Sequence, residues 1–210
     1  MLMRLTERLG GALALISGRP LSDLDRLFAP LRLAAVGGHG AEIRPRADAE
    51  SHRLRIAPLD PVLKARFAAI AQLDSRILIE DKGYSIAIHY RLAPQAAGDI
   101  VKAVARLCEE SHCSGLSILP GKAVIEIKPR GFDKGSGLQE LMSHPPFAGR
   151  RPIFIGDDVT DEAAFAVLPL FSGIGISVGG SAPGASFNFD GPKDVRLWLQ
   201  HLSCTNAESR

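Results

Sequence analysis

The segment Ile153-Phe-Ile-Gly-Asp-Asp-Val-Thr-Asp-Glu162 runs from an apolar stretch directly into several carboxylates. An apolar strand that ends in acidic residues at a loop is how an α/β protein builds a divalent-metal site. Asp157 and Asp161 offer hard oxygen ligands, which suit Mg²⁺, an ion that keeps several waters and is usually shared with a phosphate. Gly156 is expected to let the chain turn sharply, and Thr160 to cap the following helix. A solvated acidic turn is the alternative.

Two further segments have the residue types that bind phosphate. Ser17-Gly18-Arg19 follows an apolar stretch and offers a hydroxyl, a backbone N–H and a guanidinium. Serine and glycine after a strand are also common in ordinary turns, which is the alternative interpretation. Lys134 opens a predicted helix, where its charge opposes the positive end of the helix dipole. We therefore expect a charge partner for Lys134, either an aspartate or a bound phosphate.

A third group of polar residues lies on or beside predicted strands in the middle of the chain. Glu80, Lys82 and Glu126 have apolar neighbours, as in Leu78-Ile-Glu-Asp-Lys and Val124-Ile-Glu-Ile-Lys. Charges at such positions are usually solvated at the edge of a sheet. Two carboxylates flanking an amine could instead bind the hydroxyls of a sugar.

The elements that must position these residues follow an α/β order at both ends of the chain. Apolar patterning predicts a strand over residues 11–16 and a helix over 20–28 with Leu21, Leu24, Leu27 and Phe28 on one face. A short strand over 33–37 then enters the turn Gly37-Gly-His-Gly40. After Lys128 the alternation returns, with helices over 133–142, 160–168 and 192–201 and strands over 152–155 and 173–178.

The middle third has a different pattern. Strands over 77–80 and 84–90 form an antiparallel hairpin, and helices over 61–73 and 95–109 and strands over 116–119 and 123–127 surround it. The sequence thus predicts an α/β core with a parallel sheet, formed by residues 1–45 and 129–210, and an α+β cap inserted over 46–128.

The balance of charged residues limits the kinds of partner that the chain can bind. The 210 residues are 46% hydrophobic and carry 25 Lys and Arg against 23 Asp and Glu. A net charge of +2 argues against nucleic acid or an anionic membrane surface, although a small anion needs only a local basic pocket. We expect a cytoplasmic protein, because the start lacks the apolar region of a secretory signal and the longest apolar stretch is too short to cross a bilayer. Oligomeric state is not predicted.

The three cysteines indicate neither a disulfide framework nor a metal site. Cys108, Cys113 and Cys204 are odd in number and irregularly spaced. Cys108, His112 and Cys113 lie together but lack a second pair of ligands, which disfavours zinc.

Taken together, six segments resemble the trehalose-6-phosphate phosphatases of the haloacid dehalogenase superfamily, in the same order and over nearly the whole chain. They are Ala14-Leu-Ile-Ser-Gly-Arg19, Gly38-His-Gly-Ala-Glu42, Glu80-Asp-Lys-Gly83, Val124-Ile-Glu-Ile-Lys-Pro-Arg-Gly131, Lys134-Gly135 and Phe154-Ile-Gly-Asp-Asp-Val-Thr-Asp-Glu162.

The resemblance implies a role for each group and a Rossmann-like core for the fold. Ser17 would contact the phosphate, Lys134 would neutralise charge on phosphate and nucleophile, and Asp157 would bind Mg²⁺ with support from Asp161. The cap residues Glu80, Lys82 and Glu126 would bind the glucose hydroxyls of trehalose. Arg19, His39 and Arg130 have no assigned role beyond a place near the phosphate or the hinge.

One motif of the family is absent. A strand ending in Asp-x-Asp-Gly-Thr should precede Ser17, and its first Asp attacks phosphorus while the second acts as general acid and base. Here no Asp precedes Ser17, and the only Asp-x-Asp, Asp23-Leu24-Asp25, is expected on a helix surface. The sequence thus resembles an N-terminally truncated member that lacks the central core strand, through gene-start choice, the limits of the cloned segment or true loss.

The expected function is therefore Mg²⁺-dependent hydrolysis of trehalose 6-phosphate to trehalose and phosphate, with this chain inactive as written. A catalytically inert sugar-phosphate binder is one alternative. A phosphatase for another sugar phosphate is the other.

Overall fold

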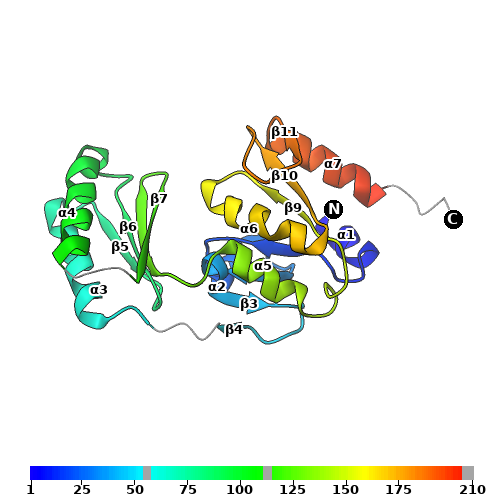
Figure 1. The fold of residues 1–210 in the computed structure, drawn as a ribbon, viewed down its shortest axis with the longest axis horizontal. Helices are drawn as coiled ribbons and strands as arrows, with labels where there is room; N and C mark the ends of the chain where they lie inside the picture. Colours follow the sequence, from blue (N-terminus) through cyan, green and yellow to red (C-terminus); the bar gives the residue numbers. More distant parts are fainter. Residues whose placement is uncertain (54–57, 111–114, 205–210) are drawn as a thin grey trace. The chain divides into compact units, whose positions relative to one another are not determined.

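The computed structural model describes residues 1–53, 58–110 and 115–204, and the chain divides into two compact units (Figure 1). Unit 1 comprises Met1–Leu54 and Phe132–Arg210, and unit 2 comprises Arg55–Gly131. The second unit is thus an insertion between the two parts of the first. Unit 1 extends beyond the predicted boundary at residue 45, because a short strand after it, His52–Arg53, pairs with the strand Glu42–Arg44.

Unit 1 contains the helices and strands at the two ends of the chain. Its helices are α1 (Leu2–Arg8), α2 (Leu21–Phe28), α5 (Lys134–Met142), α6 (Glu162–Val167) and α7 (Pro192–Cys204). Its strands are β1 (Ala14–Ile16), β2 (Ala34–Gly37), β3 (Glu42–Arg44), β4 (His52–Arg53), β9 (Ile153–Gly156), β10 (Ile174–Val178) and β11 (Phe187–Phe189). Short 3-10 turns are η1 (Gly38–Gly40), η4 (Val159–Asp161) and η5 (Leu168–Phe171).

The strands of unit 1 form two sheets. One has the order β1-β2-β3-β4, with β1 and β2 parallel and the remaining pairs antiparallel. The other has the order β11-β10-β9 and is parallel throughout. Helices cover both faces of β2, since Ala34 and Val36 pack in a cluster with residues of α5 and α6, whereas Ala35 packs with residues of α2. This alternation confirms the α/β class predicted from the sequence.

The two strands that lead into the candidate site are both edge strands. Within the described residues, β1 pairs only with β2 and β9 pairs only with β10. Residues of both strands, including Ile16 and Phe154, nevertheless belong to one hydrophobic cluster. A parallel strand of an α/β sheet is normally paired on both sides. The additional strand expected from the sequence stays a prediction.

Unit 2 is an antiparallel sheet covered by helices. Its strands, β5 (Leu78–Asp81), β6 (Ile86–His89), β7 (Leu116–Gly121) and β8 (Val124–Pro129), have the order β5-β6-β8-β7. Its helices are α3 (Pro61–Ala68) and α4 (Ala97–Glu110), with 3-10 turns η2 (Ala69–Leu73) and η3 (Pro94–Ala96). The predicted hairpin is confirmed by the antiparallel pairing of β5 with β6.

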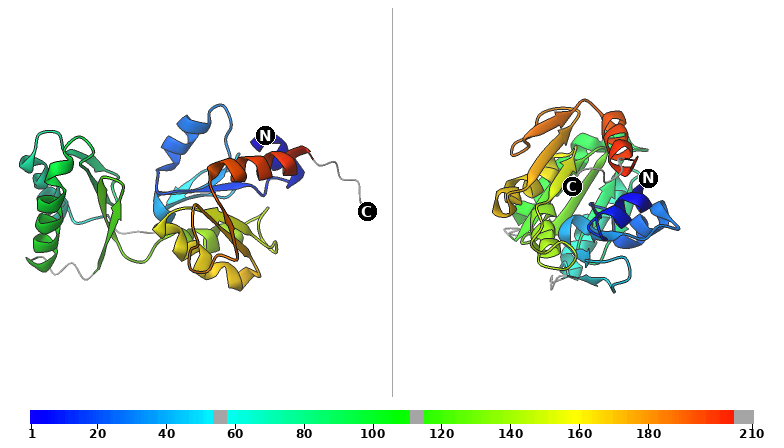
Figure 2. Two further views of the ribbon diagram at one scale, coloured as in Figure 1. Left: turned by 90° about the horizontal axis from the view of Figure 1, so that it is seen from above. Right: turned by 90° about the vertical axis from the view of Figure 1, so that its right-hand side faces the viewer.

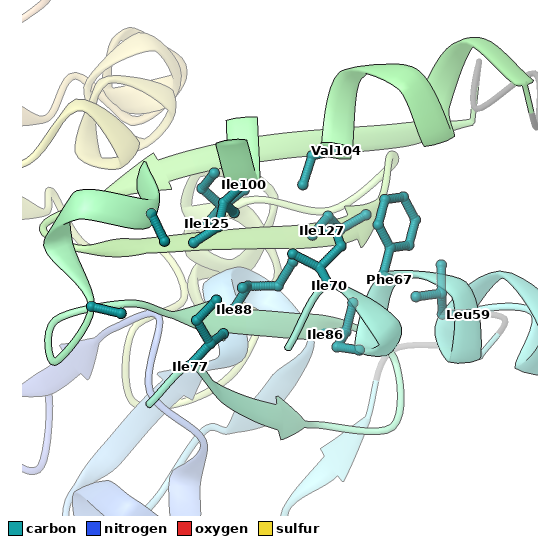
Figure 3. Close-up of a cluster of buried hydrophobic side chains, with 12 residues drawn as sticks. Leu59, Phe67, Ile70, Ile77, Ile86, Ile88, Ile100, Val104, Ile125 and Ile127 are labelled. Atoms are coloured by element: carbon teal, nitrogen blue, oxygen red, sulfur yellow. The ribbon is translucent and has the colours of Figure 1, made fainter. Parts of the chain in front are cut away.

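One face of this sheet forms the core of unit 2. Ile86, Ile88, Ile125 and Ile127 point toward the helices and pack with Phe67 and Ile100 (Figure 3). Because side chains alternate along a strand, the residues between these isoleucines lie on the opposite face. The polar residues that alternate with these isoleucines therefore lie on the sheet face away from the core.

An ion pair between a buried arginine and a half-exposed aspartate connects α2 to β3 in unit 1. The Arg44 side chain is 2% exposed and binds both carboxylate oxygens of Asp25, at 2.8 and 2.6 Å, while its Nε donates to the Leu33 carbonyl. Hydrogen bonding to Arg44 lowers the pKa of Asp25. Asp25 lies on the helix surface as predicted, with its side chain 39% exposed, and its carboxylate binds the buried Arg44. Asp23 pairs with the exposed Arg26.

Several predicted details are wrong. Leu27 was expected on the buried face of its helix but is 60% exposed, whereas Leu21 and Leu24 are buried. Among the α-helices and strands in the described ranges, α1, β3, β4 and β11 were not predicted. Helix α1 lies beside α7 in all views (Figures 1 and 2).

Two sequence-based expectations concern membranes and cysteines. No helix in the described ranges has both the length and the apolar run needed to cross a bilayer. Cys108 packs at the edge of the unit 2 core, and Cys204 is exposed. His112 and Cys113 lie outside the described residues.

Candidate active site

The carboxylate of Asp161 connects two segments of the candidate site. Its Oδ1 accepts a hydrogen bond from Lys134 Nζ at 2.7 Å. Its Oδ2 accepts from the backbone N–H groups of Asp157 and Asp158, both at 2.9 Å. Both side chains of the ion pair are buried, with 9% of Lys134 and 5% of Asp161 exposed. Asp161 is therefore the charge partner that the position of Lys134 required.

Local sequence explains how the β9 loop holds this carboxylate. Asp158 is the N-cap of η4 and Asp161 closes the capping box, so these two residues stabilise the turn. Thr160 was expected to act as the cap, which is wrong, and its hydroxyl is buried without a hydrogen-bond partner in the described structure. Gly156 does not have a positive φ, so its backbone conformation does not itself require glycine. A Cβ at Gly156 would lie 2.6 Å from Asp161 Cβ, so glycine is needed for close approach.

The N-terminus of α5 presents Lys134 to the same loop. Asp133 caps this helix through a reciprocal capping box with Ser136. A Cβ at Gly135 would lie 2.3 Å from the carbonyl oxygen of Ala163, so α5 and α6 approach closely at this point. The close approach and the cap together fix the base of the Lys134 side chain.

Asp157 has the properties of a magnesium ligand. It is exposed, and its carboxylate makes no hydrogen bond or ion pair with residues 1–53, 58–110 or 115–204. Asp161 is less suited to bind a metal directly, because both of its carboxylate oxygens already accept hydrogen bonds from Lys134 and the backbone. The described residues contain no group of three or more His, Cys, Asp or Glu side chains that could enclose a metal. The donors fit Mg²⁺, which is commonly bound by one or two carboxylates and several waters.

The Ser17-Gly18-Arg19 loop follows β1. The Ser17 hydroxyl accepts a hydrogen bond from the Arg19 N–H at 3.1 Å. The Arg19 guanidinium is exposed and has no hydrogen bond or ion pair to the described parts of the chain. The Glu42 carboxylate accepts from the Leu21 N–H at 2.7 Å and so stabilises the start of α2 just beyond the loop. The loop thus presents a hydroxyl and a free cation on an anchored backbone.

A hollow of about 190 Å³ lies at the carboxyl ends of β9 and β10. Asp157, Asp158 and Glu162 line one part of it, and the segment from Ser177 to Ala182 lines another. Neither Ser17 nor Lys134 lines this hollow. The carboxyl ends of parallel strands are where open α/β sheets bind ligands.

In unit 2, Glu80, Lys82 and Glu126 lie on the sheet face opposite the hydrophobic core. Glu80 is opposite Ala87, and Ala87 is opposite Glu126, which places both carboxylates on one row of the sheet. Lys82 Nζ binds Glu126 Oε2 at 2.9 Å, and their side chains are 9% and 8% exposed. The alternative that these are solvated edge charges is therefore wrong for Lys82 and Glu126.

The sequence did not indicate two other polar residues on this face. Ser85 donates a hydrogen bond to Glu126 Oε1 at 2.8 Å, and His89 Nε2 lies 2.9 Å from Glu80 Oε2. Both lie on or beside β6, and the register of the hairpin with period-two alternation would have placed them there. Arg130, in contrast, donates to the Leu116 carbonyl, at the end of this sheet.

Comparison with known proteins identifies the family. The sequence model of the trehalose-phosphatase family matches residues 1–188. The chain belongs to the trehalose-phosphatase family. A protein of Escherichia coli (strain K12), "Trehalose-6-phosphate phosphatase", is 37% identical over 202 residues, which is 95% of this chain and 74% of that protein.

Two other relatives support the family and the fold. "Trehalose-phosphate phosphatase" of Mycobacterium tuberculosis is 32% identical over 203 residues, 91% of this chain and 51% of that protein. The solved "C. albicans Trehalose-6-phosphate phosphatase C-terminal domain" matches with a TM-score of 0.79 at 20% identity, over 95% of this chain and 80% of that chain. The predicted resemblance and fold class are therefore confirmed, and the family is one of phosphatases.

The Lys134–Asp161 pair can be tested by stability. Asp161→Asn leaves Lys134 with an uncompensated buried charge, and we expect a loss of about 3 kcal/mol in the unfolding free energy of unit 1. Adding Lys134→Met removes that charge and recovers a large part of the loss. Guanidinium unfolding followed by the fluorescence of Trp198, the only tryptophan, reports on unit 1.

The control is Asp190→Asn, at an exposed position of the same unit, which should change stability by less than about 0.5 kcal/mol. Losses from Asp161→Asn and Lys134→Met that simply add would contradict the coupling.

Proposed function

We propose that this chain forms the substrate-binding and metal-binding parts of a Mg²⁺-dependent phosphomonoesterase for trehalose 6-phosphate, with trehalose and phosphate as products. The observation that carries the proposal is the shared Asp161 carboxylate, which holds the Lys134 ammonium beside the loop of the free Asp157 carboxylate. Membership of the trehalose-phosphatase family, and relatives named for this reaction, support the choice of substrate.

The residues of unit 1 would act on the phosphate. The Lys134 ammonium and the Arg19 guanidinium would bind phosphate oxygens and offset their charge, and the Ser17 hydroxyl would donate a further hydrogen bond. Asp157 would hold Mg²⁺, which would supply Lewis-acid stabilisation of charge on the phosphoryl group when bound. Asp161 would keep Lys134 and the Asp157 backbone in place throughout.

The residues of unit 2 would select the sugar. Glu80, Lys82 and Glu126, with Ser85 and His89, form a polar row that offers several hydrogen-bond acceptors and donors to hydroxyl groups. A site built to bind hydroxyls discriminates strongly, because ligands that lack them leave buried polar groups without partners.

These 210 residues do not supply the attacking carboxylate in the position that the family motif implies. Their only Asp-x-Asp lies on α2, where Arg44 binds Asp25 on both oxygens and Asp23 pairs with Arg26. We therefore expect the 210-residue polypeptide to bind substrate without turning it over. The same observation favours the second candidate function, an inert sugar-phosphate binder.

Phosphate release decides between these functions. The purified 210-residue polypeptide with Mg²⁺ and trehalose 6-phosphate should release phosphate no faster than buffer. A version extended at its N-terminus by a strand ending in Asp-x-Asp-Gly-Thr should gain activity, and the same extension with Asn in place of the first Asp should not. Robust release by the unextended polypeptide, abolished by Asp157→Ala, would show that the nucleophile lies elsewhere in the chain.

Substrate choice has a separate test in the extended protein. Glu126→Gln should lower kcat/KM for trehalose 6-phosphate by about 100-fold, because it removes the charge that holds Lys82 and Ser85 in the polar row, and should change it by less than about threefold for p-nitrophenyl phosphate. Glu109→Gln, an exposed position of the same unit, is the matched control. Equal losses on both esters would reject the sugar-binding role, and faster hydrolysis of a hexose phosphate than of trehalose 6-phosphate would favour another substrate.

A further inference from the structure

The turn η1, Gly38-His39-Gly40, has an unusual backbone for its sequence. His39 has φ 55° and ψ 30°, in the left-handed region that non-glycine residues rarely adopt. Glycines flank it on both sides and also have positive φ. A histidine held in this conformation between glycines indicates that the side chain itself is needed there.

The His39 imidazole lies directly against Gly18. A Cβ built on Gly18 would be 2.2 Å from Nε2 and 2.5 Å from Cε1 of His39, and the three nearest atoms all belong to this ring. Gly18 does not have a positive φ, so its backbone conformation does not require glycine. The imidazole occupies the space that a side chain at residue 18 would need.

The backbone of the turn is bonded to the same loop. The His39 N–H donates to the Ser17 carbonyl at 3.0 Å, and the Gly38 N–H donates to the Arg19 carbonyl at 2.9 Å. The loop is thus held on both sides of Gly18 by backbone hydrogen bonds and at Gly18 by the ring.

The other end of the turn contacts the helix that carries Lys134. A Cβ on Gly40 would lie 2.1 Å from the carbonyl oxygen of Asp133, the N-cap of α5. On the next turn of the helix, a Cβ on Gly137 would lie 3.0 Å from Gly40 Cα. No side chain can be inserted between η1 and α5 without moving one of them.

We propose that η1 is the spacer that sets the separation between the Ser17-Gly18-Arg19 loop and Lys134, and that His39 is a positioning residue that seats the Gly18 peptide. The inference rests on the proposed function, in which that loop and Lys134 bind one phosphate. A rigid spacer keeps both binding groups in place before the ligand arrives, which preserves affinity that a mobile loop would lose.

A double-mutant cycle at Gly18 and His39 tests whether the two residues act together. In the 210-residue polypeptide with Mg²⁺, calorimetric titration with inorganic phosphate should give about tenfold weaker binding for Gly18→Ala and for His39→Gly than for the wild type. Combining the two changes gives the new methyl group room, so the double variant should bind more tightly than Gly18→Ala alone. His39→Asn, which tolerates the left-handed backbone, should fall between the wild type and His39→Gly.

Two readouts separate positioning from general damage. Titration with Mg²⁺ alone should give the same affinity in every variant, because Asp157 is held by Asp161 and not by η1. Gly191→Ala, at a glycine with no atom within 4 Å of the added Cβ, is the control for the substitution itself. Loss of Mg²⁺ affinity in parallel with phosphate affinity would reduce His39 to a purely structural role and overturn the proposal.

Lys134→Met distinguishes failure of this inference from failure of the proposed function. If Lys134→Met leaves phosphate affinity unchanged, the phosphate site itself is wrongly placed. If Lys134→Met instead abolishes phosphate binding, the phosphate site stands. The spacer role of η1 is then rejected if Gly18→Ala and His39→Gly have no effect, or if their losses in binding free energy simply add in the double variant.

Discussion

The structure of the candidate site depends on one carboxylate with three hydrogen bonds. A buried lysine ammonium is costly without a partner, and a loop that leaves a strand end has backbone N–H groups to satisfy. Asp161 meets both requirements, since one oxygen binds Lys134 and the other binds the amides of Asp157 and Asp158. Both Asp161 oxygens are thus occupied, whereas the Asp157 carboxylate has no hydrogen bond or ion pair to the described residues. One residue thus connects Lys134, proposed to bind the phosphate, with Asp157, proposed to bind the cation.

Glycines make this arrangement possible by allowing close contact more often than by allowing unusual turns. Gly156 admits the Asp161 side chain, Gly135 admits the Ala163 carbonyl, and Gly18 admits the His39 ring. None of these three has a positive φ. In unit 2 the polar row is also held by internal contacts, because Lys82 and Ser85 each donate a hydrogen bond to one oxygen of Glu126.

The sequence predicted much of this fold because apolar periodicity survives wherever a sheet or helix has one buried face. It placed the helices α2, α4, α5 and α7 and the hairpin of unit 2, and the motif order identified the family. The prediction from sequence failed where tertiary contacts determine the structure. The strands β3 and β4 are short and lie at the two ends of a polar segment, and Leu27 is helical but faces solvent. The sequence predicted Thr160 as the helix cap, whereas the N-cap is Asp158, since residue type alone does not show which oxygen reaches the free amides at the start of a helix.

The central claim is that Asp161 holds Lys134 and the Asp157 loop so that a cation and a phosphate bind at one site. The most direct measurement is a crystal structure of the chain grown with Mg²⁺ and inorganic phosphate. We expect Mg²⁺ about 2.1 Å from an Asp157 oxygen and a phosphate oxygen about 2.8 Å from Lys134 Nζ, with the Asp161 contacts unchanged. Mg²⁺ bound by Asp161 after its release from Lys134, or phosphate bound away from Lys134, would contradict it.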